Sequence, residues 1–349
     1  MKAIFIERIG LPADALRVRD CPSPAVGPGQ VKIRVSAFGV NFADVLARTG
    51  MYMDAPRLPF IPGYEVAGIV VEVGDGCKRI RPGQRVAAMT DFGGYAQEAV
   101  AQEGAVVEIP GDMEWATAAA IPVNGVTALL ALKGLTNIFK GDRVLIHAAA
   151  GGVGLMAVQM ALDEGCEVFG TVSSEKKAEF LRAMGVQHPL IHSRVDVETE
   201  IRRITNDQGL DLVLDSLGGS SISAGMRMLA PSGRLVSIGI ASMTPRKTRN
   251  LVSAGFGLLK TPFFHPYSLL SDSKSYIGIN IKRIAEKRPA VLARAFNDCF
   301  TLLEQGRIKP HLDSVFAFED CWKAHERLHG RKSIGKVVVA FGEGEEAAG

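Results

Sequence analysis

A turn of small residues between 148 and 154 has the composition and spacing of a phosphate-binding loop. An apolar run at 144–146 precedes this turn, and a helical pattern at 155–162 follows it. Because such a turn has almost no side chains, backbone N–H groups and the N-terminus of the next helix can approach a pyrophosphate closely. Alanine at 148 replaces the first glycine of the usual fingerprint, so this spacing by itself fits tight packing as well as dinucleotide binding.

The residues after the turn favour dinucleotide binding, because they complete a strand–helix–strand unit. Gly165 ends the helical pattern, and 167–171 has the apolar character of a second strand. The residue that reads the adenosine ribose is expected about 20 residues beyond the turn, where Ser173 and Ser174 stand. We therefore predict that the dinucleotide phosphates bind at Ala150, Gly151, Gly152, Val153 and Gly154.

The end of the second strand also indicates which dinucleotide binds. Enzymes that select NAD place Asp or Glu there, and this carboxylate repels the 2′-phosphate of NADP. Here the side chains are the hydroxyls of Ser173 and Ser174, followed by the ammonium of Lys177. Hydroxyls and a lysine suit a phosphate, whereas Glu175, or a purely solvated Lys177, argues the other way. The sequence predicts NADPH as the cofactor.

Composition restricts the class of protein. A chain of 349 residues, 47% of them hydrophobic, can build two domains, each with its own core. The net charge of +3 is close to neutral, which gives no reason to expect nucleic acid as a partner. Five scattered cysteines without a C-x-x-C pair predict neither a disulfide framework nor a cysteine-rich zinc site. Charges close to the N-terminus and the lack of a long apolar run predict a cytoplasmic protein with no transmembrane segment.

The chain divides into two kinds of pattern. Up to residue 122, short alternating runs are broken by Gly and Pro, which is typical of a compact, mostly β domain. Beyond it, helical periods alternate with apolar strands, which predicts an α/β fold with a doubly wound parallel sheet. The end of the chain returns to the character of the first domain. We therefore place one domain at 1–122 and 282–349 and the other at 123–281; the later elements are strands at 211–215, 233–239, 276–280 and 336–340 and a helix at 290–305.

Several motifs, in the same order along nearly the whole chain, resemble those of one family. The segments 39–44 and 62–68, together with the turn at 148–154, resemble the medium-chain dehydrogenase/reductase superfamily, in its zinc-free quinone oxidoreductase (zeta-crystallin-like) branch. Further segments look most like its vesicle amine transport protein homologue subgroup: 39–52, 188–189, 215–219 and 306–315.

The resemblance implies the architecture and the assembly. It implies a Rossmann-type dinucleotide-binding domain at 123–281 and a GroES-like, mostly β catalytic domain made by the rest of the chain. It also implies a homodimer, formed by edge-to-edge pairing of the strand at 276–280.

Two positions in this resemblance decide the expected chemistry. In the zinc alcohol dehydrogenases of the superfamily, the position of Asn41 holds a cysteine ligand and that of Tyr64 a histidine ligand. An amide and a phenol cannot replace a thiolate and an imidazole on zinc, so we expect no metal. The resemblance places Asn41 beside the nicotinamide and substrate, and Tyr52 matches a tyrosine that related enoyl reductases use as a proton donor. We predict Asn41, Tyr52 and Tyr64 as catalytic residues, with a structural, half-buried phenol as an equal alternative for Tyr52.

The resemblance also assigns residues to the two halves of the cofactor. His192 is expected against the adenine, where relatives often carry tyrosine. Gly239, Ile240 and Lys336 are expected beside the nicotinamide half.

Two pairs of ionisable residues have the i, i+4 spacing of neighbours on one helix face. Asp44 and Arg48 are expected to form an exposed ion pair of small energetic value. His325 and His329 are expected on a solvated face, because no third metal ligand lies near them in the sequence.

These features together predict an NADPH-dependent, zinc-independent oxidoreductase. Hydride that arrives at a quinone or similar conjugated carbonyl leaves charge delocalised onto an oxygen, which hydrogen bonds can stabilise without a metal. Reduction of an enone or enoyl group is the alternative with the same hydride donor. A third hypothesis is a nucleotide-containing protein with little catalysis, whose basic and aromatic segment 243–275 contacts a lipid surface or a partner. A surface loop is the simpler interpretation of that segment.

Overall fold

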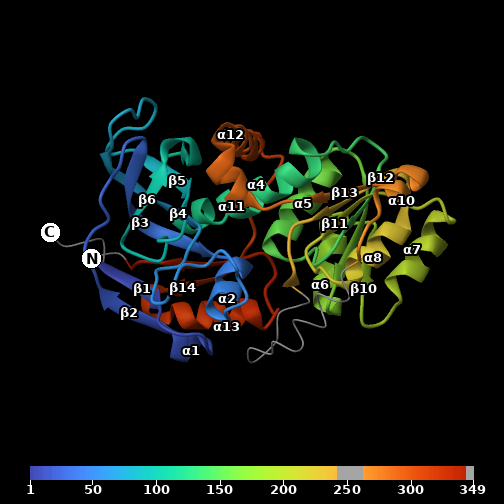
Figure 1. Ribbon diagram of the computed structural model, residues 1–349, viewed down its shortest axis with the longest axis horizontal. Helices are drawn as coiled ribbons and strands as arrows, with labels where there is room; N and C mark the ends of the chain where they lie inside the picture. The colour runs from blue at the N-terminus through green and yellow to red at the C-terminus, as the bar shows by residue number, and fades with distance from the viewer. Residues whose placement is uncertain (242–261, 343–349) are drawn as a thin grey trace.

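The computed structural model describes residues 1–241 and 262–342, and these form two lobes side by side along the long axis of the molecule (Figure 1). One lobe is built on a seven-stranded sheet with a two-stranded ribbon beside it, and the other on a six-stranded sheet. This arrangement confirms the predicted α/β fold with a mostly β lobe. Within the described residues, no helix combines the length and apolar character needed to cross a membrane.

The seven-stranded sheet is antiparallel except where β14 and β15 run parallel. Its order is β14-β15-β3-β4-β5-β7, and β6 pairs with β3 outside this path. The end of the chain therefore completes the sheet that its beginning started. The strands of this lobe are β1 (Lys2–Ile6), β2 (Leu16–Asp20), β3 (Gln30–Val40), β4 (Glu65–Val73), β5 (Arg85–Met89), β6 (Glu98–Gln102), β7 (Val106–Glu108), β14 (Leu312–Ala317) and β15 (Lys336–Ala340).

The six-stranded sheet is parallel throughout and has the order β10-β9-β8-β11-β12-β13. Its central strands are buried apolar runs, as expected for a sheet covered on both faces. β12 begins at Leu229 rather than at 233, because Leu229 already pairs with Leu210 of β11. The strands are β8 (Arg143–Ile146), β9 (Glu167–Val172), β10 (His188–Ile191), β11 (Leu210–Asp215), β12 (Leu229–Ser237) and β13 (Ser275–Gly278).

The helices cover these sheets and join the lobes (Figure 1). A π-helical turn at Leu130–Gly134 follows α4, and short 3₁₀ turns lie at Glu103–Ala105 and Phe318–Asp320. The helices are α1 (Pro12–Ala15), α2 (Phe42–Arg48), α3 (Trp115–Ala119), α4 (Pro122–Leu129), α5 (Gly152–Asp163), α6 (Glu175–Ala183), α7 (Val197–Thr205), α8 (Ser220–Met228), α10 (Pro266–Asp272), α11 (Ile281–Lys287), α12 (Pro289–Glu304) and α13 (Cys321–His329).

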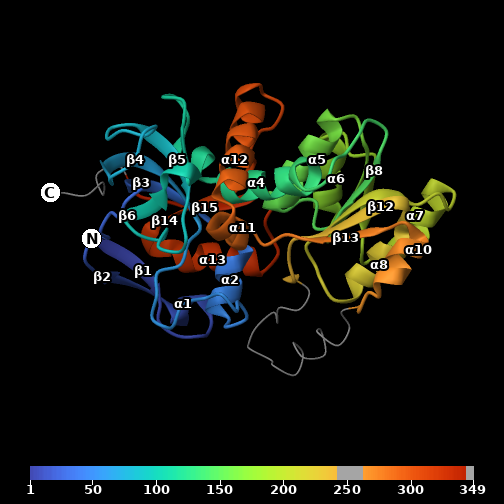
Figure 2. The same cartoon turned by 45° about the horizontal axis from the view of Figure 1, so that its top comes forward.

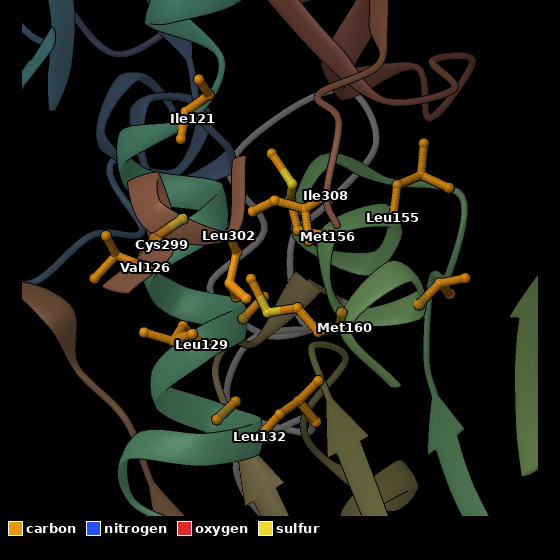
Figure 3. Close-up of a cluster of buried hydrophobic side chains, with 14 of the residues drawn as sticks. Ile121, Val126, Leu129, Leu132, Leu155, Met156, Met160, Cys299, Leu302 and Ile308 are labelled. Atoms are coloured by element: carbon orange, nitrogen blue, oxygen red, sulfur yellow. The ribbon is translucent and has the colours of Figure 1, made fainter. Parts of the chain in front are cut away.

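The lobes share a hydrophobic core where α4, α5 and α12 meet. Figure 2 shows α12 standing between the two sheets, beside α4. Gly125 of α4 lies against Cys299 of α12, and a Cβ at Gly125 would come within 2.3 Å of the Cys299 sulfur. The buried side chains of this contact include Ile121, Val126, Leu129, Leu132, Leu155, Met156, Met160, Cys299, Leu302 and Ile308 (Figure 3). This packing fixes α5, the helix that follows the turn at 148–154, relative to the β lobe.

The prediction that Asp44 and Arg48 form an exposed ion pair is wrong. Asp44 is 0% exposed and Arg48 is 1% exposed, because α13 packs against α2, the helix that carries both. Asp44 accepts hydrogen bonds from the backbone N–H groups of Asn41 (2.8 Å) and Gly63 (3.1 Å) instead of pairing with Arg48. Arg48 donates to the carbonyl of Gly10. Spacing on one helix could not reveal a second helix that covers the face.

The predicted solvated face for His325 and His329 is also wrong. His325 is 0% exposed, and its Nε2 lies 3.2 Å from the Tyr95 hydroxyl. His329 is partly buried, with its Nδ1 3.1 Å from Arg48. Both histidines lie on α13, so the face expected to meet water is the face that packs on the β lobe.

Part of the basic and aromatic segment 243–275 can be placed. Residues 243–261 of it lie outside the described residues. The remainder includes α10 and the first residue of β13, and Phe263, Tyr267 and Leu270 are exposed there.

Candidate functional site

The turn at 148–154 has the shape of a phosphate-binding loop. It connects β8 to α5, whose N-cap residue Gly151 makes no side-chain cap. A Cβ at Gly154 would lie 2.5 Å from the Ala148 carbonyl oxygen and 2.7 Å from that of Ala149, so the close approach of helix to strand requires glycine. The first N–H groups of a helix have no partner within the helix, and here they point out of its N-terminus. The loop can therefore accept an anion.

A buried imidazole at the base of this loop lacks part of its hydrogen bonding. The Nδ1 of His147 lies 3.1 Å from the Thr171 hydroxyl at the end of β9. Its Nε2 is buried without a hydrogen-bond partner in the described chain. Burial lowers the pKa of His147, so the ring is neutral. Because buried polar atoms are almost always satisfied, this nitrogen fits a site that binds a polar ligand.

The predicted ribose and adenine residues lie along the ends of β9 and β10. Ser173 and Ser174 follow β9, and exposed His192 follows β10, with its N–H on the Val172 carbonyl at 3.1 Å. The Lys177 ammonium donates to the Arg331 carbonyl at 2.9 Å. The nearby carboxylate of Glu175 is paired with both Arg182 and Arg194. The acidic side chain that would oppose a 2′-phosphate is thus neutralised.

The two lobes touch at the phosphate loop. Gly335, just before β15, donates its N–H to the Ala150 carbonyl at 2.8 Å and forms an isolated bridge with Gly151. Gly239 and Ile240 follow β12 at the same edge of the six-stranded sheet, where the Ala241 N–H binds the Ser216 carbonyl at 3.1 Å. Of the predicted nicotinamide residues, Lys336 thus lies next to the residue that contacts the loop, and Gly239 and Ile240 lie against the residues that follow β11.

Asn41 lies in a buried cluster of charged and polar groups. Its Nδ2 donates to Glu65 Oε1 at 2.8 Å, and its Oδ1 accepts from Lys336 Nζ at 2.7 Å. Lys336 also forms an ion pair with Glu65, whose second oxygen accepts the Val123 N–H at 2.7 Å. Glu65 was not predicted as a site residue. The available signal was a carboxylate directly after Tyr64, the position that holds a zinc ligand in the zinc alcohol dehydrogenases.

Tyr52 and Tyr64 belong to an aromatic group next to this cluster. Their ring centroids are 6.1 Å apart, and Phe92 lies 4.9 Å from Tyr64. Tyr64 is buried, and its hydroxyl has no hydrogen-bond partner among the described residues. Burial raises the pKa of both phenols, so each stays protonated at neutral pH and can donate a hydrogen bond. Tyr52 is only partly buried, which leaves it open to a ligand.

Asp44 should make stability depend on pH. Burial raises its pKa from 3.8 to about 7, against the hydrogen bonds that lower it. Because of the raised pKa, Asp44 keeps its proton in the folded chain at pH values above 4, where the unfolded chain releases it. Each rise in pH toward 7 therefore favours the unfolded chain and lowers the free energy of unfolding. Relative to Asp44→Asn, the wild type should lose about 2 kcal/mol of unfolding free energy between about pH 5.5 and 7. Urea titrations at both pH values measure this difference, and an equal change in both proteins would contradict it.

Comparison with known proteins identifies the family. Residues 27–111 match the alcohol dehydrogenase GroES-like domain, and residues 152–295 match the family described as zinc-binding dehydrogenase. The human synaptic vesicle membrane protein VAT-1 homolog is 36% identical over 340 residues, which cover 95% of this chain and 84% of that protein. The chain belongs to the medium-chain dehydrogenase/reductase superfamily. Bovine quinone oxidoreductase-like protein 2, 31% identical over 92% of this chain and 87% of its own length, places it in the quinone oxidoreductase-like branch, close to VAT-1.

Solved structures of this superfamily share the whole fold. Escherichia coli quinone oxidoreductase complexed with NADPH has a TM-score of 0.85 and 26% identity, covering 97% of this chain and 100% of that one. The CurK enoyl reductase has a TM-score of 0.83 and 29% identity, covering 98% and 99%. The chain thus has the fold of an oxidoreductase family, and quinone and enoyl reductases are among the solved structures that it resembles. No group of three His, Cys, Asp or Glu side chains that could hold a metal occurs in the described part of the chain.

Proposed function

We propose that this protein is a zinc-independent, NADPH-dependent reductase of quinones or similar conjugated carbonyls. The observation that carries the proposal is the donor set of Asn41, Tyr52 and Tyr64. It consists of an amide and two protonated phenols, and the carboxylate that accepts from the amide, Glu65, is paired with Lys336. Such donors can stabilise an oxygen on which charge develops, but they are poor zinc ligands.

The fit of NADPH to the site rests on this chain's own residues. The uncapped N-terminus of α5 and the unpartnered nitrogen of His147 are suited to a polar, anionic ligand. Ser173, Ser174 and Lys177 would contact the 2′-phosphate, and His192 the adenine. When bound, NADPH supplies a hydride. The NADPH complex of a related quinone oxidoreductase supports the same preference here.

The donors determine which acceptor the site favours. Hydride addition to a quinone or an enone leaves negative charge on an oxygen, and Asn41 and Tyr52 can donate hydrogen bonds to that oxygen. A plain alcohol would have to lose its proton before it gave up hydride, and an amide and phenols offset a localised alkoxide charge less than a metal ion does. We therefore assign the protein to carbonyl-conjugated acceptors.

The first experiment measures NADPH oxidation, with NADH in parallel. The acceptors are a naphthoquinone, an α,β-unsaturated ketone, an enoyl thioester and a simple aldehyde. We expect turnover of the quinone or the ketone, with NADPH preferred over NADH. Tight NADPH binding without turnover of any acceptor would instead favour a nucleotide-containing binding protein.

Enoyl or enone reduction is the second candidate, and the partly exposed phenol of Tyr52 favours it. Reduction of a carbon–carbon double bond needs a proton at carbon, whereas water can protonate a hydroquinone oxygen. Tyr52→Phe should therefore slow enone reduction by about tenfold or more and quinone reduction much less. Steady-state rates with both acceptors measure the ratio, and equal slowing of both would remove Tyr52 as the carbon acid.

The remaining proposals concern the oligomeric state, the cellular location and the domain limits. We propose a homodimer in which β13, the edge strand of the six-stranded sheet, pairs with its counterpart. We also propose a cytoplasmic location, and domain limits at 1–122 with 282–349 and at 123–281. Peripheral lipid contact through the exposed side chains Phe263, Tyr267 and Leu270 would belong to the alternative binding function.

A further inference from the structure

The carboxamide of Asn41 is fixed in one orientation by two oppositely charged neighbours. The ammonium of Lys336 can only donate, so it faces Oδ1 at 2.7 Å. The carboxylate of Glu65 can only accept, so it faces Nδ2 at 2.8 Å. Turning the amide over would place two donors together and two acceptors together. The charges of the neighbours therefore decide which end of Asn41 points where.

This arrangement leaves Asn41 with one hydrogen to offer. The Nδ2 group carries two hydrogens, and Glu65 is its acceptor among the described residues. The amide oxygen is engaged by Lys336. A ligand that meets Asn41 therefore meets a donor.

The pair of charges is built tightly into the fold. The side chain of Lys336 is 4% exposed and that of Glu65 is 0% exposed. A Cβ at Gly39 would lie 2.3 Å from Glu65 Oε1 and 2.6 Å from Lys336 Cε, so the pair occupies space that only glycine leaves. Solvent cannot rearrange these groups, and their geometry is set by β3, β4 and β15.

Lys336 is also connected to the phosphate loop through backbone hydrogen bonds. Gly335, the neighbour of Lys336, binds the Ala150 carbonyl at 2.8 Å. The backbone N–H of Lys336 binds the His311 carbonyl at 2.8 Å. Lys336 therefore holds its position relative to the phosphate loop, and through Lys336 so does the amide of Asn41.

We propose that Lys336 and Glu65 are positioning residues that make Asn41 a hydrogen-bond donor toward the substrate. The site then selects ligands with an accepting oxygen, a carbonyl or the oxyanion formed from it, over ligands that present a hydroxyl proton. In this proposal Lys336 acts through Asn41 and does not bind a phosphate group of the cofactor. This inference rests on the proposed reductase function and narrows its substrate class.

The test removes both charges together, because a single Lys336→Met change would leave the buried Glu65 carboxylate unpaired and could unfold the chain. In Lys336→Met/Glu65→Gln, the two amides can pair in either orientation. We expect kcat for the quinone to fall about tenfold or more, while the Kd for NADPH changes less than about threefold. Lys336→Arg keeps a donor toward Asn41 and should retain more activity than the double variant. NADPH fluorescence titrations and steady-state kinetics give the two quantities.

A second lysine–glutamate pair in the same sheet, between β3 and β4, serves as the control. Lys32 of β3 and Glu72 of β4 form an ion pair at 2.8 Å away from the site, and Lys32→Met/Glu72→Gln should leave both quantities unchanged. If the site variant kept its kcat, with or without a loss of NADPH affinity, the positioning role would be overturned and the proposed function would stand. A wild type that reduces no acceptor would overturn both.

Discussion

Replacing Gly154 by valine is expected to abolish NADPH binding. The new Cβ would lie 2.5 Å from the Ala148 oxygen and 2.7 Å from the Ala149 oxygen, which is closer than real Cβ atoms come to other atoms. Both neighbours are backbone atoms of the phosphate loop, so the loop itself must move. A displaced loop no longer directs its N–H groups at a pyrophosphate, and a loss of about 100-fold in affinity, or about 2.7 kcal/mol, is expected.

Fluorescence titration with NADPH measures this affinity, and circular dichroism checks that the chain is folded. Gly111→Val is the matched control, because no atom lies within 4 Å of a Cβ there. We expect the control to bind as the wild type does. A Gly154→Val protein with unchanged affinity would mean that the dinucleotide binds elsewhere.

Replacing Asn41 by alanine should reduce turnover by about 100-fold or more with little effect on NADPH affinity. The substitution removes the donor toward the substrate oxygen, and loss of one such donor typically lowers kcat by about 10²–10³. It leaves the Lys336–Glu65 ion pair in place, so no buried charge loses its opposite charge. The effect should therefore appear in kcat rather than in the stability of the lobe.

The nearly isosteric variant Asn41→Leu separates shape from hydrogen-bond donation. Leucine keeps the branched shape of the side chain but has no N–H and adds no charge beside Glu65, so the variant should be as inactive as alanine. Asn297→Ala, at an exposed position of α12, is the control and should keep full activity. If Asn41→Leu turned over substrate like the wild type, donation from Asn41 would play no part in the reaction.

Features carried by consecutive residues could be predicted from the sequence. The strand, turn of small residues and helix around 148–154 all lie within one stretch of chain, and they form where the pattern placed them. The helix predicted at 290–305 is α12, and the strand predicted at 336–340 is β15. Periodicity and glycine reveal these elements because their causes are local.

The partners of the buried charges were decided by the tertiary structure. The i, i+4 spacing of Asp44 and Arg48 fits an exposed ion pair equally well, until α13 covers α2. Arg48 then lies against His329 of α13, and Asp44 accepts from the Asn41 N–H. Lys336 was predicted beside the nicotinamide, but its contacts with Asn41 and Glu65 join residues nearly 300 positions apart. The sequence determined which elements form and which side chains could react. Only the packing of strands distant in the sequence decided which charged side chains pair. Burial and electrostatic pairing depend on contacts between segments that no local sequence pattern connects.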